Sequence, residues 1–424
     1  MKSIIKRIIL RILKLEAKLI LSRFKPKIIA ITGTAGKTST KEAIALVLRE
    51  NFRVRKSEKS YNSEFGVPLT IIGAKTGWDS PGRWIGIISK GLKVLLFSRE
   101  YPEILVLETG VDRPGDMGDL VSWVKADVAV ATVFGSVPVH VQYFDSPGHL
   151  IKEKGKLLES LTGNGIAILN EDDKSVISFK KRLKARSMTF GFSDSADLSA
   201  SNYKINPDGI IFKVSYGGSV APVKMNLFFG RQNVYVALAA IATGLSCGVN
   251  LIRSIEALAK MRPSPGRLNL IEGMNGSLVF DDTYNSSPIA AEAAIETLAE
   301  YPAKRRIAVL GDMRELGRYS KGEHLRLGEI LRVKDVWFLL AVGEEAKYIA
   351  EGARKSGFDE AKIFEFDSAE ETGDALAQMI AEGDVILVKG SQGIRLEKLV
   401  EKIMAHPEEK EKVLARQEEE WKRR

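Results

Sequence analysis

Residues 28–40, IIAITGTAGKTST, have the types and the spacing needed to hold the phosphates of a nucleotide. Glycine at 33 and 36 lets backbone N–H groups approach phosphate oxygens, because neither residue has a Cβ. The ammonium of Lys37 could reach the terminal phosphates, and the hydroxyl of Thr38 could ligate Mg²⁺. The spacing is GxxGKT rather than the commoner GxxxxGK[ST]. The loop is expected to bind ATP through Gly33, Thr34, Ala35, Gly36, Lys37, Thr38 and Ser39.

Such a loop needs a strand before it and a helix after it. Residues 28–31 are apolar or small and predict a buried strand, and residues 40–48 have helical spacing. The N-terminus of that helix would add partial positive charge beside the phosphates. A glycine turn before a helix, with no ligand, is the alternative, and the agreement of strand, loop, lysine and hydroxyl argues against it.

A carboxylate for the metal follows a second apolar run. Mg²⁺ takes oxygen ligands beyond one hydroxyl. Glu108 ends the run ILVLE at 104–108, and the C-terminal end of a buried parallel strand lies where such sheets bind ligands. A solvated strand end is the alternative for Glu108. By their types alone, His140 is a structural histidine and Lys154 a surface lysine.

Three polar loops follow later strands, namely DDTYNSSP at 281–288, LGDMRELG at 310–317 and VKGSQG at 388–393. Because the carboxyl ends of parallel strands meet at one edge, the three loops suggest a binding face. Turn chemistry is sufficient to explain any one of them.

The order of the elements predicts an α/β fold. From residue 28 to about 260, strands and helices alternate as in a mostly parallel sheet, and residues 186–229 predict a small antiparallel subsheet. MRPSPGR at 261–267 has the composition of a linker, and strands resume after it. We expect a basic amphipathic helix at 1–27, a central ATP-binding domain at 28–261, a Rossmann-like ligase domain at 262–406 and a charged tail at 407–424.

Composition limits the class of protein. A length of 424 residues allows two or three domains. The single cysteine, Cys247, excludes an internal disulfide and a cysteine-cluster metal site, and with no signal cleavage site it indicates the cytoplasm. Of the net charge of +9, +8 belongs to residues 1–27. The rest of the chain is nearly neutral, so we expect no nucleic-acid partner.

The N-terminal segment alternates apolar and basic residues at helical spacing. Its charges are too frequent for a membrane span. We expect residues 1–22 to lie on a membrane surface, where each Lys or Arg contributes up to about 1 kcal/mol. The stretch 84–97 has a similar composition. Packing against the protein body or a partner chain is the alternative for the first segment, and a buried core helix for the second.

Several motifs, in order and spacing, resemble the Mur ligases, the ATP-dependent amide-bond-forming enzymes of peptidoglycan synthesis. They lie between residues 28 and 400 and include ITGTAGKTSTKE, YNSEFGVPLT, LETGVDRPGDM, GRQNVY, PGRL, DDTYNSSP, LGDMRELG and VKGSQGIRLE. The chain is most similar to the MurF-like branch, which adds D-alanyl-D-alanine to a UDP-linked muramyl tripeptide. The short phosphate-binding loop is itself typical of the family.

The resemblance implies roles that residue types alone do not give. Lys37 would hold the ATP phosphates, Thr38 and Glu108 one Mg²⁺, and His140 a second Mg²⁺. Lys154 stands where the family has a lysine carbamylated by CO₂, which would be a further metal ligand. Further nucleotide contacts are implied for Asn233, Arg267, Asp282, Tyr284 and Asn285. Contacts with the other substrates are implied for Asn62, Asp312, Arg314, Lys389 and Ser391.

The implied reaction forms an acyl phosphate from a cell-wall peptide precursor, which a small amine or dipeptide then attacks. Members of the branch also have an N-terminal domain that binds the UDP-sugar, and a strand that starts at residue 28 leaves no room for it. Gln232 stands where a histidine is common. We expect the basic helix to replace that domain and to bring the enzyme to a membrane-proximal acceptor on the inner face of the cell membrane.

Two other functions are compatible with these residues. A ligase of the folylpolyglutamate or polyglutamate synthase type would keep the chemistry and change the acceptor. A membrane-tethered nucleotide-binding protein without catalysis would keep only the phosphate loop. Retention of Lys37, Thr38, Glu108, His140 and Lys154 together argues against the second alternative.

Overall fold

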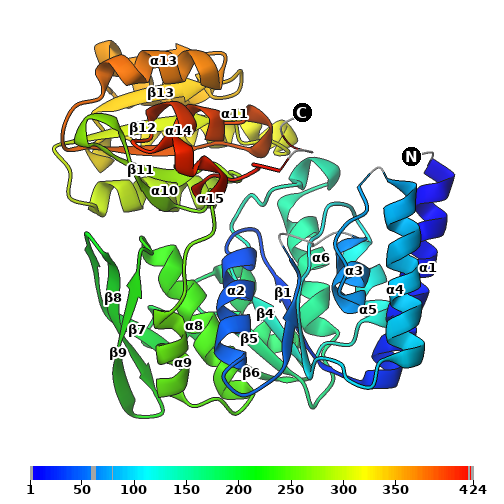
Figure 1. Ribbon diagram of the computed structural model, residues 1–424. Coiled ribbons are helices and arrows are strands. Elements are labelled where there is room, and N and C mark those ends of the chain that lie inside the picture. Colours follow the sequence, from blue (N-terminus) through cyan, green and yellow to red (C-terminus); the bar gives the residue numbers. More distant parts are fainter. Residues whose placement is uncertain (1–2, 59–63, 79, 419–420, 422–424) are drawn as a thin grey trace.

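The computed structural model describes residues 3–58, 64–78, 80–418 and 421, and it contains two stacked α/β units (Figure 1). The larger unit is built on a nine-stranded sheet with the order β2-β3-β1-β4-β5-β6-β7-β8-β9. The smaller unit is built on a six-stranded sheet with the order β10-β11-β15-β12-β13-β14. The predicted fold class, a mostly parallel ATPase unit followed by a second α/β unit, is confirmed.

The first part of the large sheet is parallel. Its strands are β1 (Lys27–Thr32), β2 (Val54–Lys56), β3 (Ile104–Glu108), β4 (Val128–Ala131), β5 (Ile166–Asn170) and β6 (Arg186–Gly191). β1, β3 and β4 are almost continuously apolar because both faces of the sheet are covered. One face packs against α2 (Lys37–Leu48), α8 (Arg231–Ser246) and α9 (Leu251–Ala259). The other packs against α3 (Gly66–Ile72), α5 (Asp116–Trp123), α6 (Pro147–Glu159) and α7 (Lys174–Ile177).

The antiparallel strands continue this sheet rather than forming a separate one. β7 (Leu198–Asn206) pairs with β6 in parallel over two residues, and then with β8 (Gly209–Tyr216) in antiparallel orientation. β9 (Ser219–Asn226) completes the meander. The sequence placed the start of the antiparallel region at residue 186, but β6 still runs parallel to β5. Side chains alternate between the two faces of the sheet in parallel and antiparallel strands alike. The alternation of apolar and polar residues could therefore not show that β6 is a parallel strand.

The smaller sheet is parallel except at one edge, where β10 (Asn269–Glu272) runs antiparallel to β11 (Leu278–Asp282). The other strands are β12 (Arg305–Gly311), β13 (Phe338–Val342), β14 (Ile363–Phe366) and β15 (Asp384–Lys389). α10 (Pro288–Glu300), α11 (Ser320–Glu329) and α12 (Lys347–Lys355) cover one face. α13 (Ala369–Met379) and α14 (Glu397–Ile403) cover the other. The edge strands β10 and β14 are too short and too polar to have been predicted.

Two long helices lie outermost on the large unit, α1 (Ser3–Phe24) and α4 (Pro81–Phe97) (Figure 1). α1 packs on α3 and α4 through apolar residues spaced by three or four positions, which are Ile9, Leu13, Ala17 and Ile20. No helix in the described residues combines the length and the apolar character that crossing a bilayer requires.

Part of the segment expected to be a charged tail from residue 407 is packed against the protein in the residues that the structure describes. α15 (Lys410–Val413) is followed by Leu414, Ala415 and Arg416, which are all buried. This packing was not predicted, because the buried stretch in the described part of the segment is only three residues long, 414–416, and charged residues surround it.

Candidate active site

The phosphate loop connects β1 to α2, and backbone geometry requires glycine at two of its positions. A Cβ on Gly33 would lie 2.0 Å from the Thr132 hydroxyl, and Gly36 has a φ of 80°. The Thr34 amide donates to the Val133 carbonyl at 2.6 Å, and the Thr132 hydroxyl donates to the Ala35 carbonyl at 2.7 Å. The end of β4 thus fixes the shape of the loop.

The ammonium of Lys37 folds back over this loop. Its Nζ donates to the Gly33 carbonyl at 2.7 Å. Burial lowers the pKa of Lys37, the charge of Glu108 raises it and that of Arg267 lowers it. A phosphate in the loop would give the ammonium an anionic partner, which is the role that the sequence predicted.

Thr38 and Glu108 lie together, as predicted for a shared metal. The Thr38 hydroxyl is 3.1 and 3.0 Å from the two Glu108 carboxylate oxygens. Glu108 is 1% exposed, and its other close neighbour is Lys41, whose Nζ lies 3.6 Å from Oε2. Lys41 is fully buried and also contacts Glu42 at 3.5 Å. Lys41 was not predicted as a site residue, although its position one helical turn after Lys37 puts both lysines on one face of α2.

Lys154 projects from α6 beneath the same loop. It is 3% exposed, and its Nζ donates to the Gly33 carbonyl at 3.3 Å. Its pKa lies well below the usual value, first because burial disfavours the charged form and second because of the charge of Lys37. The prior expectation of a surface lysine, from residue type alone, is therefore wrong, whereas the family resemblance had indicated a site residue.

His140 joins the two units. Its Nδ1 lies 2.7 Å from Glu315 of the smaller unit, and its Nε2 lies 3.4 Å from Asp112. The close contact with His140 lowers the pKa of Glu315. His140 has a φ of 74°, so the loop before it is turned sharply. Asp112 and Glu315 were not singled out in the sequence, because each is an ordinary loop carboxylate until the fold brings it to the histidine.

A cavity of about 590 Å³ lies between the units, above the phosphate loop. Arg267 crosses it, with Nη2 3.1 Å from the Thr38 hydroxyl and the guanidinium 4.1 Å from the centre of the Tyr284 ring. Asn233 lines the cavity from α8, and its amide donates to the Phe229 carbonyl at 2.6 Å. The predicted nucleotide residues that line it are Thr34, Ala35, Gly36, Lys37, Thr38, Ser39, Asn233, Arg267, Asp282, Tyr284 and Asn285.

Lys389 holds one wall of this cavity in place. Its ammonium is buried and lies 2.7 Å from an Asp282 carboxylate oxygen and 2.9 Å from the Asn285 carbonyl. The structure therefore gives it a contact with the nucleotide loop, whereas the resemblance had implied a contact with the incoming amine. Arg231, Gln232 and Tyr235 also line the cavity and had not been proposed as site residues.

The other residues implied for the substrates lie apart from the cavity lining. The Ser391 amide donates to the Asp312 carbonyl at 2.9 Å, and the Arg314 amide donates to the Ser391 hydroxyl at 2.8 Å. These three form one cluster at the ends of β12 and β15. Asn62 lies outside the described residues.

The packed C-terminal segment contacts the loop at 281–288, which contains Tyr284 and Asn285 of the cavity. Arg416 donates to the Thr283 carbonyl at 3.1 Å, to the Tyr284 carbonyl and to Glu397, whose carboxylate lies at 3.2 Å. No sequence motif marks Arg416. The one feature in the sequence that could have pointed to it is its place directly after two apolar residues, Leu414 and Ala415, in a highly charged segment.

The donor chemistry fits a magnesium nucleotide. A hydroxyl and a carboxylate are the hard oxygen ligands that Mg²⁺ prefers, and the loop beside them presents backbone amides and a lysine to phosphate. The described residues contain no group of three or more His, Cys, Asp or Glu placed to hold a metal. Mg²⁺ at Thr38 and Glu108 would thus depend on the nucleotide for further ligands.

Comparison with known proteins gives the same picture. Residues 31–80 and 88–244 match the Mur ligase middle domain, and residues 266–392 match the Mur ligase glutamate ligase domain. The chain is 30% identical over 381 residues to the UDP-N-acetylmuramoyl-tripeptide–D-alanyl-D-alanine ligase of Escherichia coli K12, covering 88% of this chain and 76% of that protein. The Bacillus subtilis 168 enzyme of the same name is 27% identical, with 92% and 79% coverage.

Solved structures agree with the sequence matches. The Thermotoga maritima MurF ligase in complex with ADP has a TM-score of 0.75 and 27% identity, covering 93% of this chain and 83% of that one. An Acinetobacter baumannii MurF structure has a TM-score of 0.78 and 26% identity, with 92% and 79% coverage. A Mycobacterium tuberculosis folylpolyglutamate synthase has a TM-score of 0.64 at 15% identity, which shows a common fold alone.

Proposed function

The chain belongs to the Mur ligase family, and from that premise we propose that it joins D-alanyl-D-alanine, or a similar small amine, to a muramyl-peptide acceptor. It is an ATP-dependent, ADP-forming peptide ligase. The observation that supports the assignment is one cavity in which Lys37, Thr38, Glu108, Lys154 and Arg267 converge from both units.

The residues of the chain have distinct tasks in this reaction. Lys37 and the loop amides hold the phosphates of ATP while the acceptor carboxylate attacks the terminal phosphorus to give an acyl phosphate and ADP. Mg²⁺, when bound, offsets charge on the phosphate oxygens. Arg267 reaches from the smaller unit to the Thr38 side of the cavity, so that the nucleotide is held from both sides.

Protection of the acyl phosphate depends on the contacts between the units. The amine attacks its carbonyl carbon, and phosphate leaves. Water would compete in that step, so exclusion of solvent is part of the chemistry. His140 with Glu315, and Arg267 with Thr38, are two of the polar contacts that hold the units together over the cavity.

We further propose that Lys154 is carbamylated by CO₂ and that two Mg²⁺ ions bind, with Lys154 and His140 as ligands beyond Thr38 and Glu108. Carbamylation needs the neutral amine, and burial together with Lys37 favours that form. A carbamate would turn this buried amine into an oxygen ligand. ¹³C NMR of the full chain in ¹³C-bicarbonate should show a carbamate signal, and Lys154→Arg should lack it.

We also propose that the enzyme works in the cytoplasm at the inner face of the cell membrane, held there by the basic helix of residues 1–22. The acceptor would then be membrane-proximal. The support is the composition of α1, which has six basic residues and one acidic residue.

The deciding experiment measures ADP and phosphate release by the full chain with a panel of acceptors and amines. A UDP-linked and a lipid-linked muramyl peptide are paired with D-alanyl-D-alanine, and a folate acceptor is paired with glutamate. We expect turnover with a muramyl peptide and loss of turnover in Lys37→Ala. Turnover only with folate and glutamate would show that the acceptor is of the folate type and not a muramyl peptide. No turnover in any arm, with ADP binding intact, would contradict the ligase assignment.

A further inference from the structure

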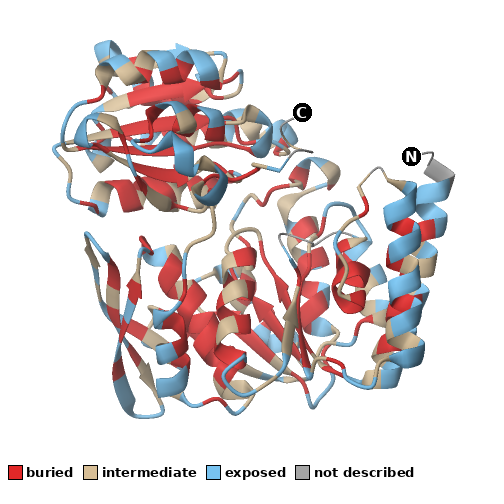
Figure 2. Cartoon of the chain, in the orientation of Figure 1, coloured by how far each residue is buried: buried red, intermediate tan, exposed pale blue. Residues whose placement is uncertain are grey.

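The outer side of the α1–α4 pair exposes apolar side chains in two rows. On α1 they are Ile5, Ile8, Leu15 and Leu19, which are 45–58% exposed. On α4 they are Ile85, Leu92 and Leu96, which are 46–66% exposed; Phe97, which is 77% exposed, ends the helix about 140° away from Leu92 and is not part of this row. Figure 2 shows both helices at the edge of the molecule with much of their surface exposed. Of the thirteen large apolar side chains that are exposed in the described residues, eight belong to these two helices.

The two rows face the same way. The helices are parallel, because Arg23 near the end of α1 donates to the Leu95 carbonyl, and to the Ser98 carbonyl at 2.9 Å, at the end of α4. Their line of contact passes through Glu16 and Gly91, where a Cβ on the glycine would lie 2.1 Å from the carboxylate.

Helical rotation then gives the direction of each row. Leu15 precedes Glu16 by one residue, whereas Leu92 follows Gly91 by one residue. Parallel helices that face each other at Glu16 and Gly91 therefore turn Leu15 and Leu92 to one common side. Leu13 and Ala17, which are buried against the body, lie on the opposite side. The result is one apolar face made by two helices, which we name the α1–α4 face.

The charge on the two helices themselves is almost all positive, although Asp119 and Glu64 of the body pair with Lys14 and Lys6 of α1. α1 and α4 together have nine basic residues, and their only acidic residue, Glu16, is buried between them. Arg7, Arg11 and Lys18 lie on α1 beside its apolar row. Lys93 lies on the far side of the α4 row. An apolar strip with cations at both borders is complementary to an anionic lipid surface.

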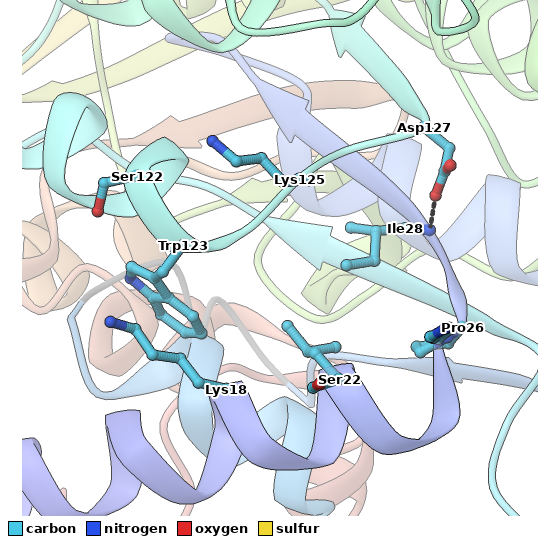
Figure 3. A pocket seen from close by; sticks show the side chains of 10 residues that line it. Lys18, Ser22, Pro26, Ile28, Ser122, Trp123, Lys125 and Asp127 are labelled. Carbon is cyan, nitrogen blue, oxygen red and sulfur yellow. Dashed lines mark hydrogen bonds between the residues drawn. The ribbon is translucent and has the colours of Figure 1, made fainter.

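A groove next to the α1 border has the same character. It has a volume of about 570 Å³, and its lining includes Lys18, Trp123, Lys125 and Asp127 (Figure 3). Lys25 also lines it, so the lysines outnumber the one carboxylate. Lysine and tryptophan are the residues that are common at the level of lipid headgroups. The basic border thus continues from α1 onto the body of the large unit.

We propose that the α1–α4 face is a bilayer-docking surface for anionic lipid, in which α4 contributes as much apolar contact as α1. The inference rests on the membrane contact proposed for α1, and adds the second helix and the side that inserts. Both helices lie in the plane of the interface, with their apolar rows among the acyl chains and their cations at the headgroups. A second copy of the chain is a poorer occupant, because two such faces would oppose like charges.

The test is co-sedimentation of the full chain with vesicles. One set contains phosphatidylcholine and phosphatidylglycerol in equal parts, and the other only phosphatidylcholine. We expect binding to the anionic set, weakening with salt, and little binding to the neutral set. The double variant Ile85→Ser, Leu96→Ser should bind at least about tenfold more weakly, because two apolar side chains no longer insert.

The matched control is Val220→Ser, Ile252→Ser, which removes two equally exposed apolar side chains on β9 and α9. It should bind like the unmodified chain. Binding of ADP verifies that each variant is folded. If the α4 variant binds like the control while Leu15→Ser, Leu19→Ser is weakened, α1 alone docks and the two-helix surface is wrong. If the unmodified chain binds neither vesicle, the membrane contact itself is wrong, whatever its ligase activity.

A dimer is the remaining outcome, and light scattering measures it. A concentration-dependent dimer that the α4 variant abolishes, without vesicle binding, would assign the face to a second copy and overturn the proposal.

Discussion

The phosphate-loop region and the α1–α4 face both have many lysines, but in opposite environments. Lys41, Lys154 and Lys389 near the loop are buried, and each has an oxygen within 3.6 Å. Lys18 and Lys93 on the face are exposed. A buried lysine lacks the hydration that an exposed one keeps, so it is stable only if a carboxylate, a carbonyl or deprotonation compensates.

The same residue type therefore has two different functions in this protein. In the loop region the energy of each cation depends on a fixed partner, which makes it specific and costly to remove. On the face the cations depend on many weak contacts, so each contributes little by itself and salt screens it. Substitutions should therefore separate the two regions sharply.

The largest effect should come from Lys37. Lys37→Ala removes the ammonium that neutralises the phosphates, and ligase turnover should fall by about a hundredfold or more. Lys93→Ala, an exposed lysine on the face, should leave turnover in solution unchanged. Steady-state ADP release measures both. Equal losses in the two variants would contradict the distinction between the regions.

Lys154 tests the cost of burying an amine. Lys154→Met keeps an unbranched side chain, one atom shorter, and removes the titrating group. Turnover should fall by about ten- to a hundredfold if a metal ligand is lost. The same substitution should also change how the free energy of unfolding depends on pH. The folded-state pKa of Lys154 lies well below the usual value of 10.5. Between these two values the unfolded chain binds a proton that the folded chain does not, so the free energy of unfolding rises with pH.

Thermal unfolding across that pH range measures the effect. The unmodified chain should gain stability as pH rises toward the usual lysine pKa, and Lys154→Met should lack that part of the gain. A carbamylated lysine at high bicarbonate should lessen the difference between the two proteins. An unchanged slope in Lys154→Met would show that the amine is solvated rather than buried.

Arg416 is a buried cation near the cavity that comes from the C-terminal segment. Arg416→Ala leaves the Thr283 carbonyl and part of the Glu397 carboxylate without a partner, which should lower the free energy of unfolding by about 1–3 kcal/mol. It should also weaken ADP binding, because Tyr284 loses its support. Arg11→Ala on the α1–α4 face is the control. Denaturant unfolding and ADP titration check both, and an Arg416 variant equal to the control would mean that the tail contributes nothing.

The smallest effect concerns the one acid of the face. Burial raises the pKa of Glu16 to about 7 from 4.5. Between these values the unfolded chain has lost its proton and the folded chain has kept it, so this carboxylate makes the protein less stable as pH rises from 4.5 to 7. Glu16→Gln should remove that decline and raise the free energy of unfolding at pH 8 by about 1–2 kcal/mol. Thermal midpoints at pH 5 and pH 8 provide the test.

Much of the fold and of the phosphate site could be predicted from local signals. The sequence of residues 28–48 predicts a strand, a glycine loop and a helix, because each of these structures depends mainly on residues that are close in the chain. The apolar run at 104–108 was predicted as a strand and is β3, and the strands expected just before the three polar loops are β11, β12 and β15. Short, continuously apolar runs are typical of buried parallel strands. Glu108 was found for the same reason, because it ends such a run.

The rest needed the tertiary structure, because it depends on residues that are distant in the chain. The sequence by itself determined the phosphate loop, the α/β class and the basic amphipathic character of α1. Only the fold decided that Lys41 and Lys154 are buried, that His140 meets Glu315, that Arg416 reaches Tyr284, and that α4 lies beside α1. Burial and pairing are properties of what packs against a residue, and for each of these the partner lies in another element.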